Sequence, residues 1–256
     1  VFIFPLGMGM FGAALATGIA PIISIAVLSL HFARGKNSFR LQKCKPDFKS
    51  IGTIFSLGFP SFVMEMSNGI VIIILNFVIL GISGNMGVAA YGIVANLALV
   101  AVSVFTGEAQ GIQPIISYNY GARRPRKVLR AAVSMALMAL VYTLTIWAVI
   151  LLAPHFLISI FSSDPTLQAD TIPAMKLYFS TFGFMLLQYV GQTVFKSLNK
   201  RRHAVFFSLL RKVIIVVPLT YLLPYAFGMG TDGVFAAEPV SNVIGGSLCF
   251  IVMLIT

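Results

Sequence analysis

Charged residues are scarce in this chain, and their scarcity limits the kinds of protein it can be. Only 10% of the 256 residues are charged and seven are acidic, whereas soluble domains carry about 25% charged residues. Hydrophobic residues make up 58% of the sequence, and the mean hydropathy is +0.95. This composition argues against a water-soluble fold and for a lipid bilayer as the environment.

Cysteines and catalytic motifs are equally sparse. The two cysteines, Cys44 in a basic segment and Cys249 in an apolar run, show no evident pairing, so no disulfide is expected. The three histidines stand at the ends of apolar runs, and the sequence contains no H-E-x-x-H, Walker or C-x-x-C motif. We therefore expect no enzyme activity, no metal site and no cofactor.

Long apolar runs dominate what is present. A helix needs about 20 residues to cross the hydrocarbon core of a bilayer, and these runs are long enough. A seventh run opens near Gly233 and continues to Thr256. The expected fold is an all-α, polytopic transmembrane bundle, whose six complete spans are predicted at residues 11–33, 52–80, 88–116, 128–153, 171–195 and 204–227.

The basic residues, which give the chain its net charge of +11, indicate its orientation. Of the 18 Lys and Arg, all except Lys176 fall in three clusters, at 34–49, 123–130 and 196–212. Two predicted spans separate successive clusters, so all three lie on one side, which the positive-inside rule makes cytoplasmic. A nucleic-acid-binding surface would need a folded basic module, and these loops are too short to form one. The loops expected on the outside contain no basic residue and comprise 81–87, 154–170 and 228–232.

One short segment occurs twice, as GMGMFG at 7–12 and as GMGTDG at 228–233, each time between two apolar runs. This repetition suggests two homologous halves. Both copies match G-x-G-x-x-G, but the first acid after Gly12 is Asp47, beyond a whole span, so a tight turn is favoured over nucleotide binding.

The repeat predicts the domain organisation. Residues 1–33 would hold the end of the fifth helix and the whole sixth helix of an N-terminal lobe. Residues 34–50 would form a cytoplasmic linker between lobes, and residues 51–256 a C-terminal six-helix lobe with a truncated last helix. Because the chain opens at Val1 rather than Met, we expect it to be part of a longer protein.

Residues 107–122 read GEAQGIQPIISYNYGA and lead into the basic 123–127. This stretch resembles the second-half signature of bacterial multidrug and toxic compound extrusion (MATE) transporters. Similar support comes from residues 12–17, 58–61 and 233–241.

The resemblance implies a twelve-helix antiporter of two lobes in the bacterial inner (plasma) membrane, which expels amphipathic, often cationic compounds in exchange for H⁺ or Na⁺. A lipid-linked oligosaccharide flippase of the same superfamily is the alternative. Many bacterial members also use a carboxylate in their first helix for ion coupling, and that helix is not in this chain.

Glu65 is the first candidate site residue, because an ionisable group inside a membrane usually faces a bundle interior or an aqueous cavity. Ser61, Glu65, Asn68 and Asn76 recur at helical spacing and form one polar stripe. Glu65, with Asn68 beside it, is expected to bind H⁺ or a cationic substrate. The alternative is a protonated Glu with a structural role.

Two further acids are candidates for ion or substrate binding, each with a structural alternative. Glu108 lies in the cytoplasmic half of its predicted span, where Arg123 or Lys127 could neutralise it. Glu238, followed by Pro239, is expected near the outer surface, where a carboxylate suits the start of a helix.

A stripe without charge completes the candidate site. Gln188 and Gln192 continue a helical pattern that begins with Tyr178, Thr181 and Met185. Polar and soft side chains of this kind suit a pocket that accepts varied ligands. They also hold transmembrane helices together, so helix packing is the alternative.

Overall fold

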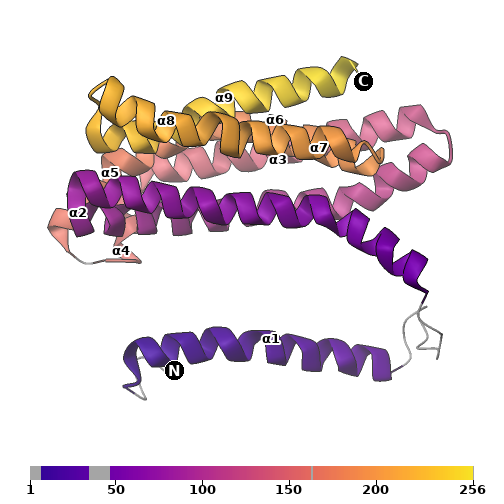
Figure 1. The fold of residues 1–256 in the computed structure, drawn as a ribbon, viewed down its shortest axis with the longest axis horizontal. Helices are drawn as coiled ribbons and strands as arrows, with labels where there is room; N and C mark the ends of the chain where they lie inside the picture. Colours follow the sequence, from indigo (N-terminus) through magenta and orange to yellow (C-terminus); the bar gives the residue numbers. More distant parts are fainter. Residues whose placement is uncertain (1–6, 35–46, 163, 256) are drawn as a thin grey trace. The chain divides into compact units, whose positions relative to one another are not determined.

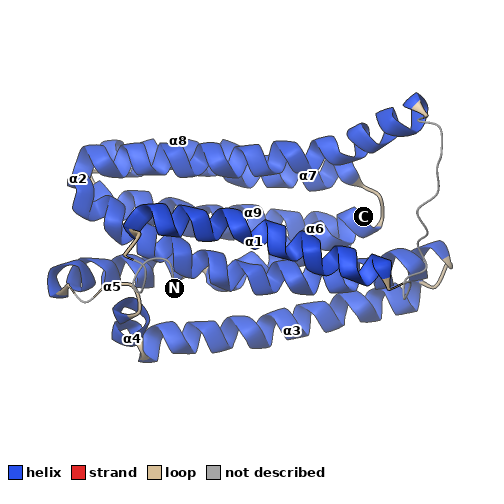
Figure 2. Ribbon diagram, turned by 90° about the horizontal axis from the view of Figure 1, so that it is seen from below, coloured by secondary structure: helices blue, strands red, loops and turns tan. Residues whose placement is uncertain are grey.

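The computed structural model describes residues 7–34, 47–162 and 164–255, and this part of the chain is helical without a strand (Figure 2). It divides into two compact units, Val1–Gly52 and Thr53–Thr256. The all-α fold is confirmed, whereas the assignment of the two units to two lobes stays a prediction.

The helices follow one another along the chain as labelled in Figure 1. The elements are α1 (Gly9–Ala33), α2 (Phe48–Gly121), α3 (Pro125–Leu152), α4 (Pro154–Ser159), α5 (Pro165–Phe179), α6 (Phe182–Ser197), α7 (Arg201–Leu209), π-helical η1 (Leu210–Val216), α8 (Val217–Tyr221), π-helical η2 (Leu222–Ala226) and α9 (Gly230–Ile255).

The long element α2 contains two of the predicted spans. Its helical geometry breaks at Gly84, which has φ 61° and ψ −153°, a conformation that only glycine adopts readily. The chain reverses there (Figure 1), and a Cβ at Gly87 would lie 2.9 Å from the side chain of Ile79. The predicted external loop 81–87 is therefore wrong in length, because one glycine makes the turn.

The predicted span 171–195 is built from two helices. It begins earlier than expected, at Pro165, because Asp164 caps α5 by accepting hydrogen bonds from the Thr166 amide at 2.9 Å and hydroxyl at 2.6 Å. These bonds lower the pKa of Asp164. The break between α5 and α6 is held by the Thr181 hydroxyl, which donates to the Pro239 carbonyl of α9 at 3.0 Å. Because α4 covers Pro154–Ser159 and α5 begins at Pro165, most of the predicted loop 154–170 is helical.

The predicted span 204–227 corresponds to the segment Arg201–Ala226, which alternates between α- and π-helix. Proline lacks an amide donor, and its ring clashes with the carbonyl four residues earlier, so the ordinary helical pattern is interrupted around it. Pro218 directly follows η1 and Pro224 lies within η2. The wider π-helical turns therefore occur next to the prolines, and η1 carries the charged Arg211 and Lys212.

The sequence repeat has a backbone counterpart. Gly7 and Gly228 have φ values of 61° and 66°, and Gly9 and Gly230 have φ values of 51° and 57°. In each copy the second of these glycines begins a long helix, α1 or α9. The two copies thus share a local conformation, which supports the interpretation of the repeat as a tight turn.

Four helical stretches of the described chain are long and apolar enough to cross a membrane. Their outer surfaces carry large exposed apolar side chains such as Phe77, Leu137 and Val141, as expected for contact with lipid. The protein is therefore a multi-pass membrane protein. The four stretches are Glu65–Gly121, which contains the Gly84 turn, Pro125–Leu152, Arg202–Ala226 and Gly230–Ile255.

The turns of the unit Thr53–Thr256 gather at two ends of the bundle. At one end, the hydroxyl groups of Ser83 and Thr231 are hydrogen-bonded beside the Gly84 turn. At the other end, the Ser117 hydroxyl donates to the Ser197 carbonyl at 3.2 Å, close to two of the basic clusters. This grouping agrees with the predicted loops, while the assignment of one end to the cytoplasm stays a prediction. Residues 35–46 of the predicted linker 34–50, including Cys44, lie outside the described residues, and Cys249 is buried and free.

Helices α6 and α9 pack closely because glycines remove side chains from their contact. A Cβ at Gly246 would lie 2.5 Å from the Phe184 carbonyl oxygen, and one at Gly191 would lie 2.8 Å from Cys249 Sγ. Small residues let transmembrane backbones approach in this way. The contact joins the helix of the Gln188 stripe to the helix of Glu238.

Gly246→Ala should destabilise the complete protein, because the new methyl group meets a backbone carbonyl that cannot rotate away. Overpacking of this kind costs about 1–3 kcal/mol, and we expect a lower Tm in detergent-solubilised protein. The matched control is Gly92→Ala, where a Cβ has no neighbour within 4 Å. Equal Tm values for the two variants would show that α6 and α9 do not pack as described.

The orientation is tested with single cysteines at Asn85 and Ala122, both exposed and at opposite ends of the bundle. With Cys44 replaced by serine and Cys249 buried, the Asn85→Cys variant should react with an impermeant maleimide added to intact cells. The Ala122→Cys variant should react only after permeabilisation, because the basic turn that follows it is expected in the cytoplasm. The reverse labelling pattern would invert the topology.

Candidate binding site in the membrane-spanning bundle

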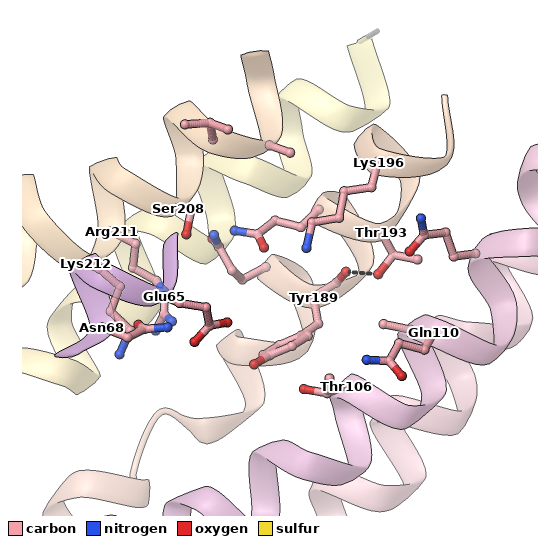
Figure 3. A pocket seen from close by; sticks show the side chains of 16 residues that line it. Glu65, Asn68, Thr106, Gln110, Tyr189, Thr193, Lys196, Ser208, Arg211 and Lys212 are labelled. Atoms are coloured by element: carbon pink, nitrogen blue, oxygen red, sulfur yellow. Dashed lines mark hydrogen bonds between the residues drawn. The ribbon is translucent and has the colours of Figure 1, made fainter. Parts of the chain in front are cut away.

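A cavity of about 440 Å³ lies among α2, α6, α7 and η1 (Figure 3). Its volume falls in the usual range of small-molecule sites, about 300–1,000 Å³. The wall is predominantly polar, with five amide side chains and three amines or guanidinium groups. The lining residues are Glu65, Asn68, Thr106, Ala109, Gln110, Gln113, Gln188, Tyr189, Gln192, Thr193, Lys196, Ala204, Val205, Ser208, Arg211 and Lys212.

Four of the six predicted site residues line this cavity. Glu65 and Asn68 reach it from the first half of α2, and Gln188 and Gln192 from α6. Helical spacing therefore identified the faces that meet at the cavity. The functional roles given to these side chains stay predictions.

The stripe on α5 and α6 divides between the two interpretations given to it. Gln188 and Gln192 face the cavity, and the Gln188 amide donates to the Phe207 carbonyl of α7 at 3.4 Å. In contrast, Met185 belongs to the hydrophobic core, and Thr181 bonds to Pro239. The C-terminal part of the stripe thus lines the cavity and the N-terminal part packs helices together.

Glu108 lies outside the cavity lining. One of its carboxyl oxygens is buried and has no hydrogen-bond partner among the described residues. The ion pairs found in residues 7–34, 47–162 and 164–255 do not include Glu108, so the expected neutralisation by Arg123 or Lys127 is not observed.

The position predicted for Glu238 is wrong. It lies well inside α9 and is only 3% exposed, rather than at a helix start near the surface. Its carboxylate binds two cations that the sequence had assigned to a cytoplasmic cluster, Arg211 and Lys212. A buried carboxylate requires such partners, since an unpaired charge in a membrane interior is costly.

The resulting charge cluster is compact and buried. Lys212 Nζ lies 2.6 Å from Glu238 Oε1, and Arg211 Nη1 lies 3.4 Å from Glu238 Oε2. The same guanidinium nitrogen donates to Asn242 Oδ1 at 2.6 Å. Gly245 makes room for the arginine, because a Cβ there would lie 3.0 Å from Arg211 Cβ and Cγ.

Arg211 and Lys212 are functional candidates that the sequence interpretation missed. The positive-inside rule grouped them with the basic residues after Lys196, although both lie several residues inside the predicted span 204–227. That position within an apolar run was the available signal. Charged residues there need a buried partner or water.

The cavity wall carries opposite charges at separate points. Glu65 and Lys196 line it from α2 and α6 (Figure 3). Arg211 and Lys212 line the wall from η1, with Glu238 behind them. The wall therefore offers an acidic side chain to a cationic group of a ligand and basic side chains to an anionic group.

The fold and the cavity together describe a polytopic membrane protein with a charged cavity of ligand size. The MatE family matches residues 60–222, more than half of the sequence, and the chain belongs to this family. The resemblance seen at residues 107–122 is thereby confirmed.

Curated relatives and solved structures agree with this assignment. The multidrug export protein MepA of Staphylococcus haemolyticus (strain JCSC1435) is 25% identical over 231 residues, which cover 90% of this chain and 50% of that protein. The chain thus spans about half the length of the curated relatives it matches.

Two solved structures share the fold. A MATE crystal structure in complex with MaL6 has a TM-score of 0.86 at 20% identity and covers 99% of this chain and 58% of that one. The outward-facing conformation of a multidrug resistance MATE family transporter of the MOP superfamily has a TM-score of 0.84 at 22% identity, with 99% and 57% covered.

Glu238→Gln should destabilise the protein, because it leaves two buried cations without their carboxylate. Removing one partner of a buried ion pair costs about 3–5 kcal/mol, which should lower the Tm clearly. The double variant Glu238→Gln/Lys212→Gln should recover part of this loss, since it removes one unpaired cation.

The matched control is Glu108→Gln, the same change at an acid that forms no ion pair within the described part of the chain, and it should leave the Tm nearly unchanged. A Tm for Glu238→Gln equal to that of the Glu108→Gln control would contradict the charge cluster.

Proposed function

We propose that the complete protein exports amphipathic small molecules across the bacterial plasma membrane in exchange for H⁺ or Na⁺. The observation that carries this proposal is the cavity of about 440 Å³, with Glu65 in its wall, inside a bundle of membrane-spanning helices. The multidrug export names of the curated relatives support it. These names do not favour the flippase alternative.

The cavity wall suits varied ligands. The side-chain amides of Asn68, Gln110, Gln113 and Gln192 each offer both donors and acceptors, so they adapt to different polar groups. The ring of Tyr189 adds an apolar surface with a polar edge. A site of this composition is expected to bind by general character rather than by one fixed pattern of hydrogen bonds.

Glu65 would couple export to ion entry by exclusive occupancy. While its carboxylate is ionised, it attracts either a substrate cation or the coupling ion. A proton or Na⁺ arriving from outside neutralises the carboxylate and weakens its attraction for a cationic ligand, which is then released. Lys196, in the wall of the same cavity, can balance this charge while the site is empty.

The direct test is Glu65→Gln in the complete protein, which removes the titratable charge and keeps size and hydrogen bonding. Efflux of a cationic dye should fall by at least about tenfold at matched membrane abundance. Asp170→Asn is the matched control, because Asp170 is exposed on α5 and outside the cavity. Normal efflux with unchanged dependence on pH and Na⁺ in Glu65→Gln would overturn the role of Glu65.

A further inference from the structure

The cavity proposed above to bind the exported substrate carries more positive than negative charge. Among the described residues its wall holds three basic side chains and one acid. Glu238, behind the wall, compensates one further charge. One positive charge is left over among five groups, which are Glu65, Lys196, Arg211, Lys212 and Glu238.

The excess charge is located at the η1 side of the cavity. Among the described residues, Glu238 is the only carboxylate that forms ion pairs with Arg211 and Lys212. One carboxylate cannot neutralise two cations, and a buried excess charge is unfavourable without a partner. This side of the wall therefore attracts an anion.

The hydrogen-bonding capacity at this point is also incomplete. Arg211 uses Nη1 for Glu238 and Asn242, but its Nε has no hydrogen-bond partner among the described residues. Lys212 has three ammonium hydrogens, and its hydrogen bond to Glu238 uses one of them.

We propose that Arg211 and Lys212 form a subsite for the anionic group, a carboxylate in the first instance, of a zwitterionic amphipathic substrate. This inference rests on the proposed export function and specifies the substrate class of the same cavity. The cationic part of such a molecule lies toward Glu65, and its anionic part toward η1. Glu65, Arg211 and Lys212 all line the same cavity (Figure 3), as one small molecule with two charges requires.

The zwitterion remains compatible with ion exchange. Its cation competes with H⁺ or Na⁺ for Glu65, while its carboxylate satisfies the excess charge of Arg211 and Lys212 without involving Glu65. Hydrogen bonds between charged groups are about twice as strong as neutral ones, so the carboxylate should add clearly to affinity.

The test compares rhodamine B, which carries a xanthylium cation and a carboxylate, with its methyl ester, which carries the cation alone. Binding to the complete purified protein in phosphatidylcholine nanodiscs is measured by fluorescence polarisation. Rhodamine B should bind at least about tenfold tighter than the ester. In Lys212→Gln and in Arg211→Gln this preference should fall to within about twofold, with ester binding retained as evidence of a folded site.

Lys176→Gln is the matched control, because Lys176 is an exposed lysine outside the cavity, and it should keep the preference. Nanodiscs with added phosphatidylglycerol identify the source of the anion. Loss of the preference there would mean that a lipid headgroup occupies the subsite, which overturns the proposal.

The outcomes separate the two claims. If the wild type binds rhodamine B and its ester equally well, the anionic subsite is wrong while the export function stands. If a preference exists but survives Lys212→Gln and Arg211→Gln, the assignment to these residues is wrong. If the folded protein neither binds nor exports either dye, the proposed function fails as well.

Discussion

The pairing of one buried carboxylate, Glu238, with Arg211 and Lys212 is the interaction on which the rest of the bundle depends. Three charges inside a membrane are tolerated only if they satisfy one another or reach water. The pairing fixes α9 against η1 at a defined position, with Asn242 completing the arginine's contacts. The π-helical turns of η1 and the missing side chain at Gly245 make this position sterically possible.

The same pairing contributes to the polar character of the cavity. Lys212 is only partly shielded, so the cluster borders the cavity rather than a dry core. The amides of α2 and α6 then continue the polar surface, and the aromatic core adjoins the cavity through Tyr189, which stacks on Phe105. A polar cavity beside a packed apolar core is compatible with the export function proposed above.

Much of the fold follows directly from the sequence, because a membrane-spanning helix leaves an unmistakable apolar run. The helices were therefore predicted, and four helical stretches of the described chain are long and apolar enough to cross a membrane, whereas the ends of the helices were not predicted. A single glycine with φ 61° replaces the expected loop at Gly84, and capping by Asp164 lengthens α5. Such ends are decided by local hydrogen bonds and backbone conformation, which hydropathy does not record.

The candidate site was predicted only in part, for an equally physical reason. Periodicity reveals which residues share one face of a helix, so Glu65, Asn68, Gln188 and Gln192 were found. It does not reveal which helices lie side by side. The ion pairs of Glu238 with Arg211 and Lys212 join α9 to η1. They were missed because the positive-inside rule assigned both cations to a cytoplasmic cluster.

The most direct test of the cavity as the binding site is protection of an introduced cysteine by a bound ligand. Ser208 lines the cavity from α7 and is partly exposed, so Ser208→Cys should react with a small methanethiosulfonate reagent. The measurement is the reaction rate in the complete protein, with and without saturating rhodamine B. If the cavity binds the dye, the rate should fall by at least about fivefold. An unchanged rate, in a variant that still binds and exports the dye, would place the substrate path elsewhere.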